Sequence, residues 1–121
     1  MITIEKAVML ESEKLHKMQV TAFSSLPGKY QDHDINPETE TVEQFRARFL
    51  NAKTHHYRIQ LNKECIGYAR VVMLADNGYK LSSLFILPAY QGNGYSTQAI
   101  EGIKSIYPQA KKWTLTTICD N

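Results

Sequence analysis

The segment from Leu84 to Thr97 combines residue types that could bind a diphosphate. It reads LFILPAYQGNGYST, where an apolar run ends at Pro88 and two glycines, Gly92 and Gly94, precede a stretch with helical spacing. Glycine lets the backbone approach a ligand closely or take a positive φ angle. The N–H groups at the start of a helix and the positive end of its dipole form an anion-binding site. A strand, a glycine turn and a helix in this order therefore predict a diphosphate held by main-chain groups.

Two well-known nucleotide-binding motifs fit this segment poorly. A P-loop requires Lys and then Ser or Thr directly after its last glycine, whereas Tyr95 follows Gly94. A dinucleotide-binding turn requires a third glycine, and Thr97 occupies that position. Such a turn also belongs to an all-parallel β-α-β unit early in the fold, which this sequence lacks. A nucleotide-binding regulatory domain is kept as an alternative, because a turn that binds anions does not by itself select one ligand.

Length and composition indicate a single globular domain. The chain has 121 residues, of which 43% are hydrophobic and 21% charged, and its formal charge is +2. Because Lys111-Lys112 is the longest basic cluster, we expect no nucleic-acid partner. No stretch approaches the ~20 apolar residues of a membrane-spanning helix, and the N-terminus lacks the apolar segment of a signal peptide. We therefore expect a cytoplasmic protein without membrane contact, in which Cys65 and Cys119 are buried thiols.

Periodicity and turn residues predict an α+β fold over residues 1–121. The last two strands flank a helix and should be parallel, whereas the others should be antiparallel, which gives a mixed, mainly antiparallel sheet with flanking helices. Asp76-Asn77-Gly78 predicts a hairpin, because Asn and Gly tolerate positive φ angles. The expected order is β-α-α-β-β-β-α-β, with strands at 2–8, 57–61, 65–74, 81–87 and 113–118. The helices are expected at 12–24 with Ser12 as N-cap, after the capping box Thr41–Gln44, and at 96–106.

The turn and the order of the elements together resemble the GNAT superfamily of N-acetyltransferases. The acyl-CoA motif of that superfamily is Gln/Arg-x-x-Gly-x-Gly/Ala after a strand that often ends in Pro, and Gln91, Gly94 and Pro88 match it. Ser96 stands where Gly or Ala is usual. The order of the elements matches from Met1 to the end of the chain, and the WTLTT segment at 113–117 is similar to the superfamily's fifth strand.

The resemblance implies an enzyme that transfers an acetyl group from acetyl-CoA to an amine. Main-chain groups of the fourth strand would pair with the pantetheine arm, and amides of the turn would hold the pyrophosphate. The thioester would lie where the fourth and fifth strands separate, with its carbonyl near the N–H of Ile86. The implied cofactor-binding residues are Leu84, Phe85, Ile86, Gln91, Gly92, Asn93, Gly94, Tyr95, Ser96, Thr97 and Asn121.

The acceptor side is implied to involve the long polar loop at residues 26–40. We expect Tyr30, Asp32 and Asp34 to bind the acceptor, a small-molecule or peptide amine, and the loop's acids suggest a cationic one. The catalytic residues are unassigned, because Lys80 stands where some members have a glutamate base. Candidate bases are Asp32, His33, Asp34, Glu38 and Glu64. No metal is expected, since neighbouring strand residues such as His55 and His56 point to opposite faces.

The chain ends before the helix that supplies a tyrosine acid in many members, so the resemblance is to a C-terminally truncated domain. The alternative to an enzyme is a catalytically inactive acyl-CoA-binding or interaction module of the same fold. The intact turn and the polar loop favour the enzyme, whereas Lys80 and the early end of the chain favour the module. The fifth strand would expose an apolar edge, through which a homodimer could form.

Overall fold

A computed structural model describes residues 2–24, 41–115 and 118–119 of the chain. The predicted β-α-α-β-β-β-α-β order is confirmed, with the last strand present as two short segments. The helices and strands are β1 (Ile2–Lys6), α1 (Ser12–Ser24), α2 (Val42–Ala47), β2 (Thr54–Leu61), β3 (Glu64–Met73), β4 (Gly78–Ile86), α3 (Tyr95–Ile106), β5 (Lys112–Leu115) and β6 (Ile118–Cys119). Short 3₁₀ turns occupy Met9–Glu11, Arg48–Leu50, Ala75–Asn77 and Pro88–Tyr90.

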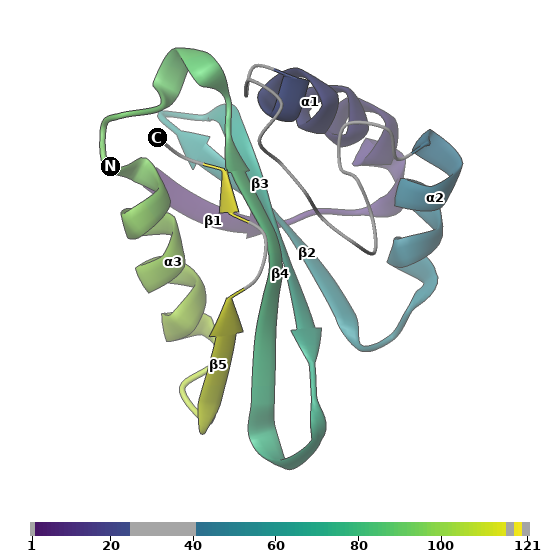
Figure 1. The fold of residues 1–121 in the computed structure, drawn as a ribbon, viewed down its shortest axis with the longest axis vertical. Coiled ribbons are helices and arrows are strands. Elements are labelled where there is room, and N and C mark those ends of the chain that lie inside the picture. Colours follow the sequence, from purple (N-terminus) through teal and green to yellow (C-terminus); the bar gives the residue numbers. More distant parts are fainter. Residues whose placement is uncertain (1, 25–40, 116–117, 120–121) are drawn as a thin grey trace.

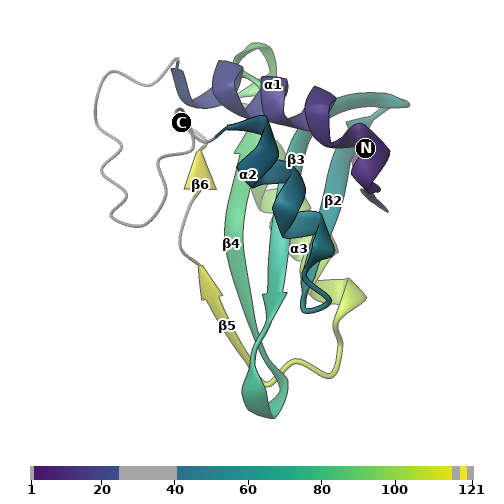
Figure 2. The same cartoon turned by 90° about the vertical axis from the view of Figure 1, so that its right-hand side faces the viewer.

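The strands form one sheet with the order β1-β2-β3-β4-β5, and β6 also lies beside β4. The pairings from β1 to β4 are antiparallel, whereas β5 and β6 run parallel to β4, as the sequence predicts. Helix α3 covers one face of the sheet (Figure 1), and α1 and α2 cover the other (Figure 2). Strand β4 therefore lies inside the sheet, with a helix layer on each side of it.

Each helix layer has its own apolar core against the sheet. On the α3 side, Ile103 packs with strand residues that include Leu84 and Ile86. On the α1 and α2 side, Phe45 packs on Tyr68, with the ring centroids 5.2 Å apart, and Tyr68 packs on Phe85. Because alternate residues of a strand point to opposite faces, β4 contributes to both cores. This double burial fixes the position of β4 and of the turn that follows it.

The start of α1 differs from the sequence prediction. Ser12 was expected to cap the helix, but the 3₁₀ turn at Met9–Glu11 leads directly into α1. The carboxylate of Glu11 accepts a hydrogen bond from the N–H of Val8 at 3.0 Å. The buried Ser12 hydroxyl instead accepts a hydrogen bond from Arg46 Nε of α2 at 3.3 Å. Ser12 thus joins the two helices and does not cap α1.

Local turn chemistry is confirmed at α2 and at the hairpin before β4. Gln44 N–H donates to Thr41 Oγ1 at 3.1 Å and Thr41 N–H donates to Gln44 Oε1 at 2.9 Å, which is the predicted capping box. Asp76 and Asn77 have φ angles of 56° and 59°. Two successive positive φ angles give a hairpin turn whose twist matches that of the flanking strands.

Of the two cysteines that the sequence predicts to be buried thiols, only Cys65 has a described side chain, and it is not fully buried. Cys65 is a half-buried free thiol, and burial raises its pKa. The Cys119 side chain lies outside what the structure describes. None of the helices in the described ranges combines the length and the apolar character needed to cross a bilayer.

Strand β4 contains a bulge at its centre. Ser83 is paired with Arg70 of β3, but the next pair joins Leu81 to Val71, so Ser82 is an extra residue on β4. A bulge bends the strand and re-aims its side chains, and bulges are common beside active sites. In this chain the bulge lies between the segment of β4 that pairs with β5 and the segment that pairs with β6.

Candidate active site

The connection from β4 to α3 is a turn with two left-handed glycines. After the 3₁₀ turn at Pro88–Tyr90 the chain is extended at Gln91. Gly92 and Gly94 then take φ angles of 81° and 77°, and Gly94 is the residue from which α3 begins. A residue with a Cβ rarely takes this conformation, which explains the two glycines. The sequence prediction of a glycine turn between a strand and a helix is confirmed.

Side chains hold this turn together from within. Gln91 Nε2 donates to the carbonyl oxygen of Ile86 at 2.7 Å, which ties the turn to the end of β4. Asn93 Nδ2 donates to the carbonyl oxygens of Tyr90 and Gln91 at 3.1 and 3.3 Å. These side-chain amides are therefore engaged by the turn itself. Sequence reasoning assigned Gln91 and Asn93 to ligand binding, and their side chains give the turn its shape.

The N-terminus of α3 is open to a ligand. The N–H of Gln98 donates to the Gly94 carbonyl at 3.2 Å, and the N–H groups of Tyr95 and Thr97 precede the first full turn of the helix. A Cβ placed on Gly94 would meet no other atom within 4 Å. Gly92, Asn93, Gly94 and Thr97 are exposed, and Ser96 is buried against the fold. This arrangement fits a diphosphate, because main-chain donors and the helix dipole face accessible space.

The strand residues expected to pair with pantetheine are paired with the chain itself. Leu84 is in register with Ile118 of β6, and Phe85 with Cys119. The register is that of β5, since Leu84 lies three positions after Leu81 and Ile118 lies three positions after Leu115. A pantetheine arm that formed main-chain hydrogen bonds with β4 at Leu84 and Phe85 would have to replace β6. The pantetheine contacts of these residues and of Ile86 stay a prediction.

Residues expected on the acceptor side are described only in part. Tyr30, Asp32, His33, Asp34 and Glu38, together with Asn121, lie outside the described residues. Lys80 is half-buried within β4 and is paired with Val72 and Thr114. Glu64, a candidate base, is exposed at the start of β3, and its hydrogen bond with Tyr90 raises the pKa of the tyrosine. Glu64 is thereby placed beside the glycine turn.

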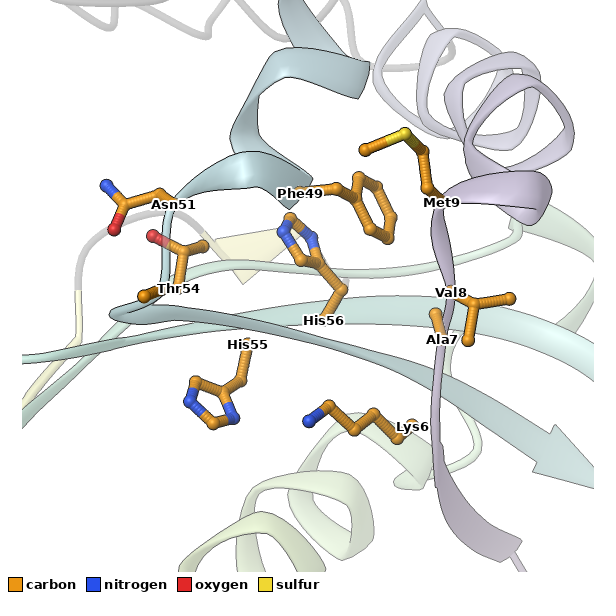
Figure 3. A pocket seen from close by; sticks show the side chains of 10 residues that line it. Lys6, Ala7, Val8, Met9, Phe49, Asn51, Thr54, His55 and His56 are labelled. Carbon is orange, nitrogen blue, oxygen red and sulfur yellow. The ribbon is translucent and has the colours of Figure 1, made fainter.

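The adjacent histidines serve different faces of the sheet, as predicted. In Figure 3 the His55 and His56 side chains point away from β2 in opposite directions, with Phe49 beside His56. Both histidines line an open cavity of about 310 Å³ that also borders Lys6, Ala7 and Thr54. No group of three or more metal-binding side chains occurs within the described part of the chain.

A buried polar cluster at the β4 bulge escaped sequence analysis. Its members are His56 of β2, Arg70 of β3 and Ser83 of β4, and their exposed fractions are 3%, 8% and 1%. His56 Nδ1 shares a 2.6 Å hydrogen bond with the Tyr68 hydroxyl, and its ring stacks on Phe49. Burial, aided by the charge of Arg70, lowers the pKa of His56 to about 4, so the ring is neutral at pH 7. The signal in the sequence was an arginine within the mostly apolar run 65–74.

The sequence matches a known protein family. The family model of the Acetyltransferase (GNAT) family matches residues 14–121. A comparison of the sequence with curated proteins gave no match.

Several solved structures share the fold. A ribosomal-protein-alanine N-acetyltransferase from Brucella melitensis biovar Abortus 2308 superposes with a TM-score of 0.72 at 7% identity, over 97% of this chain and 81% of the other. The PaiA N-acetyltransferase from Thermoplasma acidophilum, solved with coenzyme A, gives 0.70 at 16% identity, over 90% and 73%. An aminoglycoside acetyltransferase from an uncultured soil metagenomic sample, solved with sisomicin, gives 0.67 at 12% identity, over 95% and 76%. Identities this low show a common fold and leave the substrates open.

Proposed function

Because the chain belongs to the GNAT acetyltransferase family, we propose that it transfers an acetyl group from acetyl-CoA to the nitrogen of an amine. The observation that supports this most directly is the glycine turn between β4 and α3. Gly94 leaves open space in front of the α3 N-terminus, and the Gln91 and Asn93 side chains hold the turn in that shape. The PaiA N-acetyltransferase of the same fold was solved with coenzyme A.

In the proposed reaction the amine nitrogen attacks the carbonyl carbon of the thioester. A C–N bond forms, the C–S bond breaks, the amine gives up one proton and the leaving thiolate takes up one. The contribution of the turn is to bind and orient, since N–H groups that are already in place hold a diphosphate without rearrangement. Glu64 and its partner Tyr90 are titratable groups that lie beside the turn.

The alternative function is a module of the same fold that binds acyl-CoA, or a partner, without turnover. One observation favours it: Leu84 and Phe85, which would pair with the pantetheine arm, are paired with β6. Replacement of β6 would require loss of its main-chain hydrogen bonds to β4. If that exchange is unfavourable, the chain would hold the diphosphate of the cofactor and leave the thioester poorly placed.

Candidate acceptors follow from the fold relatives. An aminoglycoside acetyltransferase and a ribosomal-protein-alanine N-acetyltransferase share the fold, so small amines and protein N-termini are the first classes to compare. Both present a primary amine that must be neutral to attack the thioester. Tyr30, Asp32 and Asp34 remain proposed contacts for this amine.

The function is tested by measuring thiol release from acetyl-CoA in the presence of amine panels. An enzyme releases CoA thiol in proportion to the N-acetylated product, and the rate depends on the amine. The module alternative gives saturable binding of acetyl-CoA and no amine-dependent thiol release. Absence of binding in a folded chain would contradict both functions.

A further inference from the structure

The buried polar cluster at the β4 bulge forms a straight row across three strands. His56 of β2 is directly opposite Arg70 of β3, and Arg70 is directly opposite Ser83 of β4. Directly opposed residues of antiparallel strands point to the same face, with Cβ atoms roughly 4.5–5.5 Å apart. The bond of His56 to Tyr68 places the row on the face that α1 and α2 cover.

Two members of the row have a buried polar atom without a hydrogen-bond partner. These atoms are Arg70 Nη1 and Ser83 Oγ, whereas the His56 ring also interacts with the backbone of Arg48. Most buried polar atoms in folded proteins are paired, so two unpaired atoms on directly opposed residues require an explanation. A ligand that supplies acceptor atoms to the arginine and the serine would provide one.

Arg70 also carries a buried positive charge that no ion pair between described residues neutralises. Its Nε donates to Ser82 Oγ at 3.0 Å, which is a bond to a neutral group. The ion pairs between described residues join Arg58 to Glu5 and to Glu11, and none of them includes Arg70. A buried charge without a counter-ion is strongly unfavourable. The neighbouring His56 ring is neutral at pH 7 and supplies no negative charge. The missing counter-ion is then expected to arrive with a ligand.

We propose that Arg70 and Ser83 bind the carboxylate of the acceptor, and that the acceptor is therefore an amino acid. This inference rests on the proposed acetyltransferase function and names its substrate class. The planar guanidinium of arginine presents parallel N–H groups that match a carboxylate, and the Ser83 hydroxyl can donate a further bond. Because Nη1 and Oγ are shielded from water, these bonds would be stronger than on the surface.

The position of the row along β4 agrees with this role. Ser83 lies three residues before Ile86, which is about 10 Å along a strand. The arm of the cofactor is expected to run back along β4 from the glycine turn, toward the bulge at Ser82. A carboxylate on Arg70 and Ser83 would hold the amine of the same molecule close to that arm. At its other end the row reaches the cavity in Figure 3 through His56.

The test compares each common L-amino acid with the matching amino-acid amide, using acetyl-CoA and thiol release. The amide keeps the amine and the side chain and loses the negative charge. We expect at least one amino acid to exceed its amide in kcat/KM by tenfold or more. Sisomicin, which has amines and no carboxylate, serves as the opposite case and should react poorly because Arg70 carries a like charge.

Two variants separate this role from a structural one. Arg70→Met removes an unpaired buried charge and keeps the volume, so it should leave the melting temperature unchanged or raise it, while the KM for the amino acid rises at least tenfold. Ser83→Ala should also keep its stability and raise the same KM severalfold. The KM for acetyl-CoA should not change in either variant. Arg58→Gln is the matched control, because Arg58 is already neutralised by Glu5 and Glu11, and it should keep the preference for the carboxylate.

The outcomes distinguish this inference from the proposed function. Equal acetylation of amino acids and amides, or a folded Arg70→Met variant that keeps the wild-type preference for the amino acid, would overturn the carboxylate site and leave the acetyltransferase in place. If no amine is acetylated, calorimetric titration of the same amino acids into the chain still decides. Binding that Arg70→Met abolishes supports the site and refutes the enzyme, and absence of binding overturns the site.

Discussion

Two regions of β4 use different chemistry and differ in how they can be found. At the end of the strand, the glycine turn presents main-chain N–H groups to open space, and its side chains only hold its shape. At the centre of the strand, the bulge collects buried side chains with unpaired polar atoms. Main-chain donors suit a group that is the same in every acyl-CoA donor, such as the diphosphate. Side chains in a buried row suit discrimination between acceptors, because a wrong partner leaves them unpaired.

The largest effect is expected where the open turn is closed. Gly94→Val should reduce acetyl-CoA affinity at least tenfold, since a branched side chain is strained at a φ of 77° and fills the space in front of α3. Calorimetric titration measures the loss. Gly94→Asn is the matched variant, because Asn tolerates this conformation and still fills the space. Loss of affinity in the valine variant alone would indicate that backbone strain is responsible, and full affinity in both would refute the open turn as the binding site.

The buried row can be tested through the pH dependence of stability. The pKa of His56 is lowered to about 4 in the folded chain, below the ordinary value of 6.5, so protonation favours the unfolded chain. The stabilisation is complete above pH 6.5 and is lost as the pH falls toward 4, by at most roughly 3.4 kcal/mol at 1.36 kcal/mol per pH unit. Burial is the main cause of the lowered pKa, and the charges of Arg70, His55 and Arg48 lower it further, whereas a hydrogen bond to the Arg48 backbone raises it.

Urea unfolding of the wild type and of His56→Gln at several pH values checks this expectation. The variant should lose less stability than the wild type between pH 6.5 and 4.5, because it lacks the titrating ring. An identical decline in both proteins would mean that His56 is hydrated and titrates as an ordinary histidine, which would weaken the description of the row as a dry, buried site.

Sequence reasoning found the first region and missed the second for a physical reason. The turn is local, because Pro88, Gly92 and Gly94, which lie within a few residues of one another, predict its conformation. The bulge depends on which residue of β3 faces which residue of β4, and a shift of one position is invisible in either strand alone. In the sequence, Arg70 is therefore a single charged residue within a mostly apolar run. Nothing near Ser83 in the sequence indicates that it belongs to a polar cluster.

The other features of the fold divide in the same way into local contacts, which the sequence predicts, and long-range contacts, which it does not. The hairpin at Asp76 and Asn77 and the capping box at Thr41 were predictable, because each is a contact between near neighbours in the chain. The role of Ser12 was not, since its partner Arg46 comes from another helix. The pairing of β6 with Leu84 and Phe85 is likewise a long-range contact, and the order of elements alone did not indicate it.

A smaller effect is expected from the support of the turn. Gln91→Ala removes the 2.7 Å hydrogen bond to the Ile86 carbonyl, and we expect a loss of about 1 kcal/mol in unfolding free energy and a severalfold loss of acetyl-CoA affinity. Thermal unfolding and calorimetry measure the two effects. Gln91→Glu is informative beside it, because the carboxylate cannot donate to that carbonyl and adds negative charge near the expected diphosphate. An alanine variant with unchanged affinity would show that the turn keeps its shape without this bond.

The central claim is that the glycine turn binds the diphosphate of an acyl-CoA. It is tested most directly by calorimetric titration of the 121-residue chain with acetyl-CoA, with ATP and NAD as controls. We predict saturable binding of acetyl-CoA with one site per chain, and no comparable binding of ATP or NAD. Binding of ATP or NAD without acetyl-CoA, or no binding of any of the three by a folded chain, would contradict the claim.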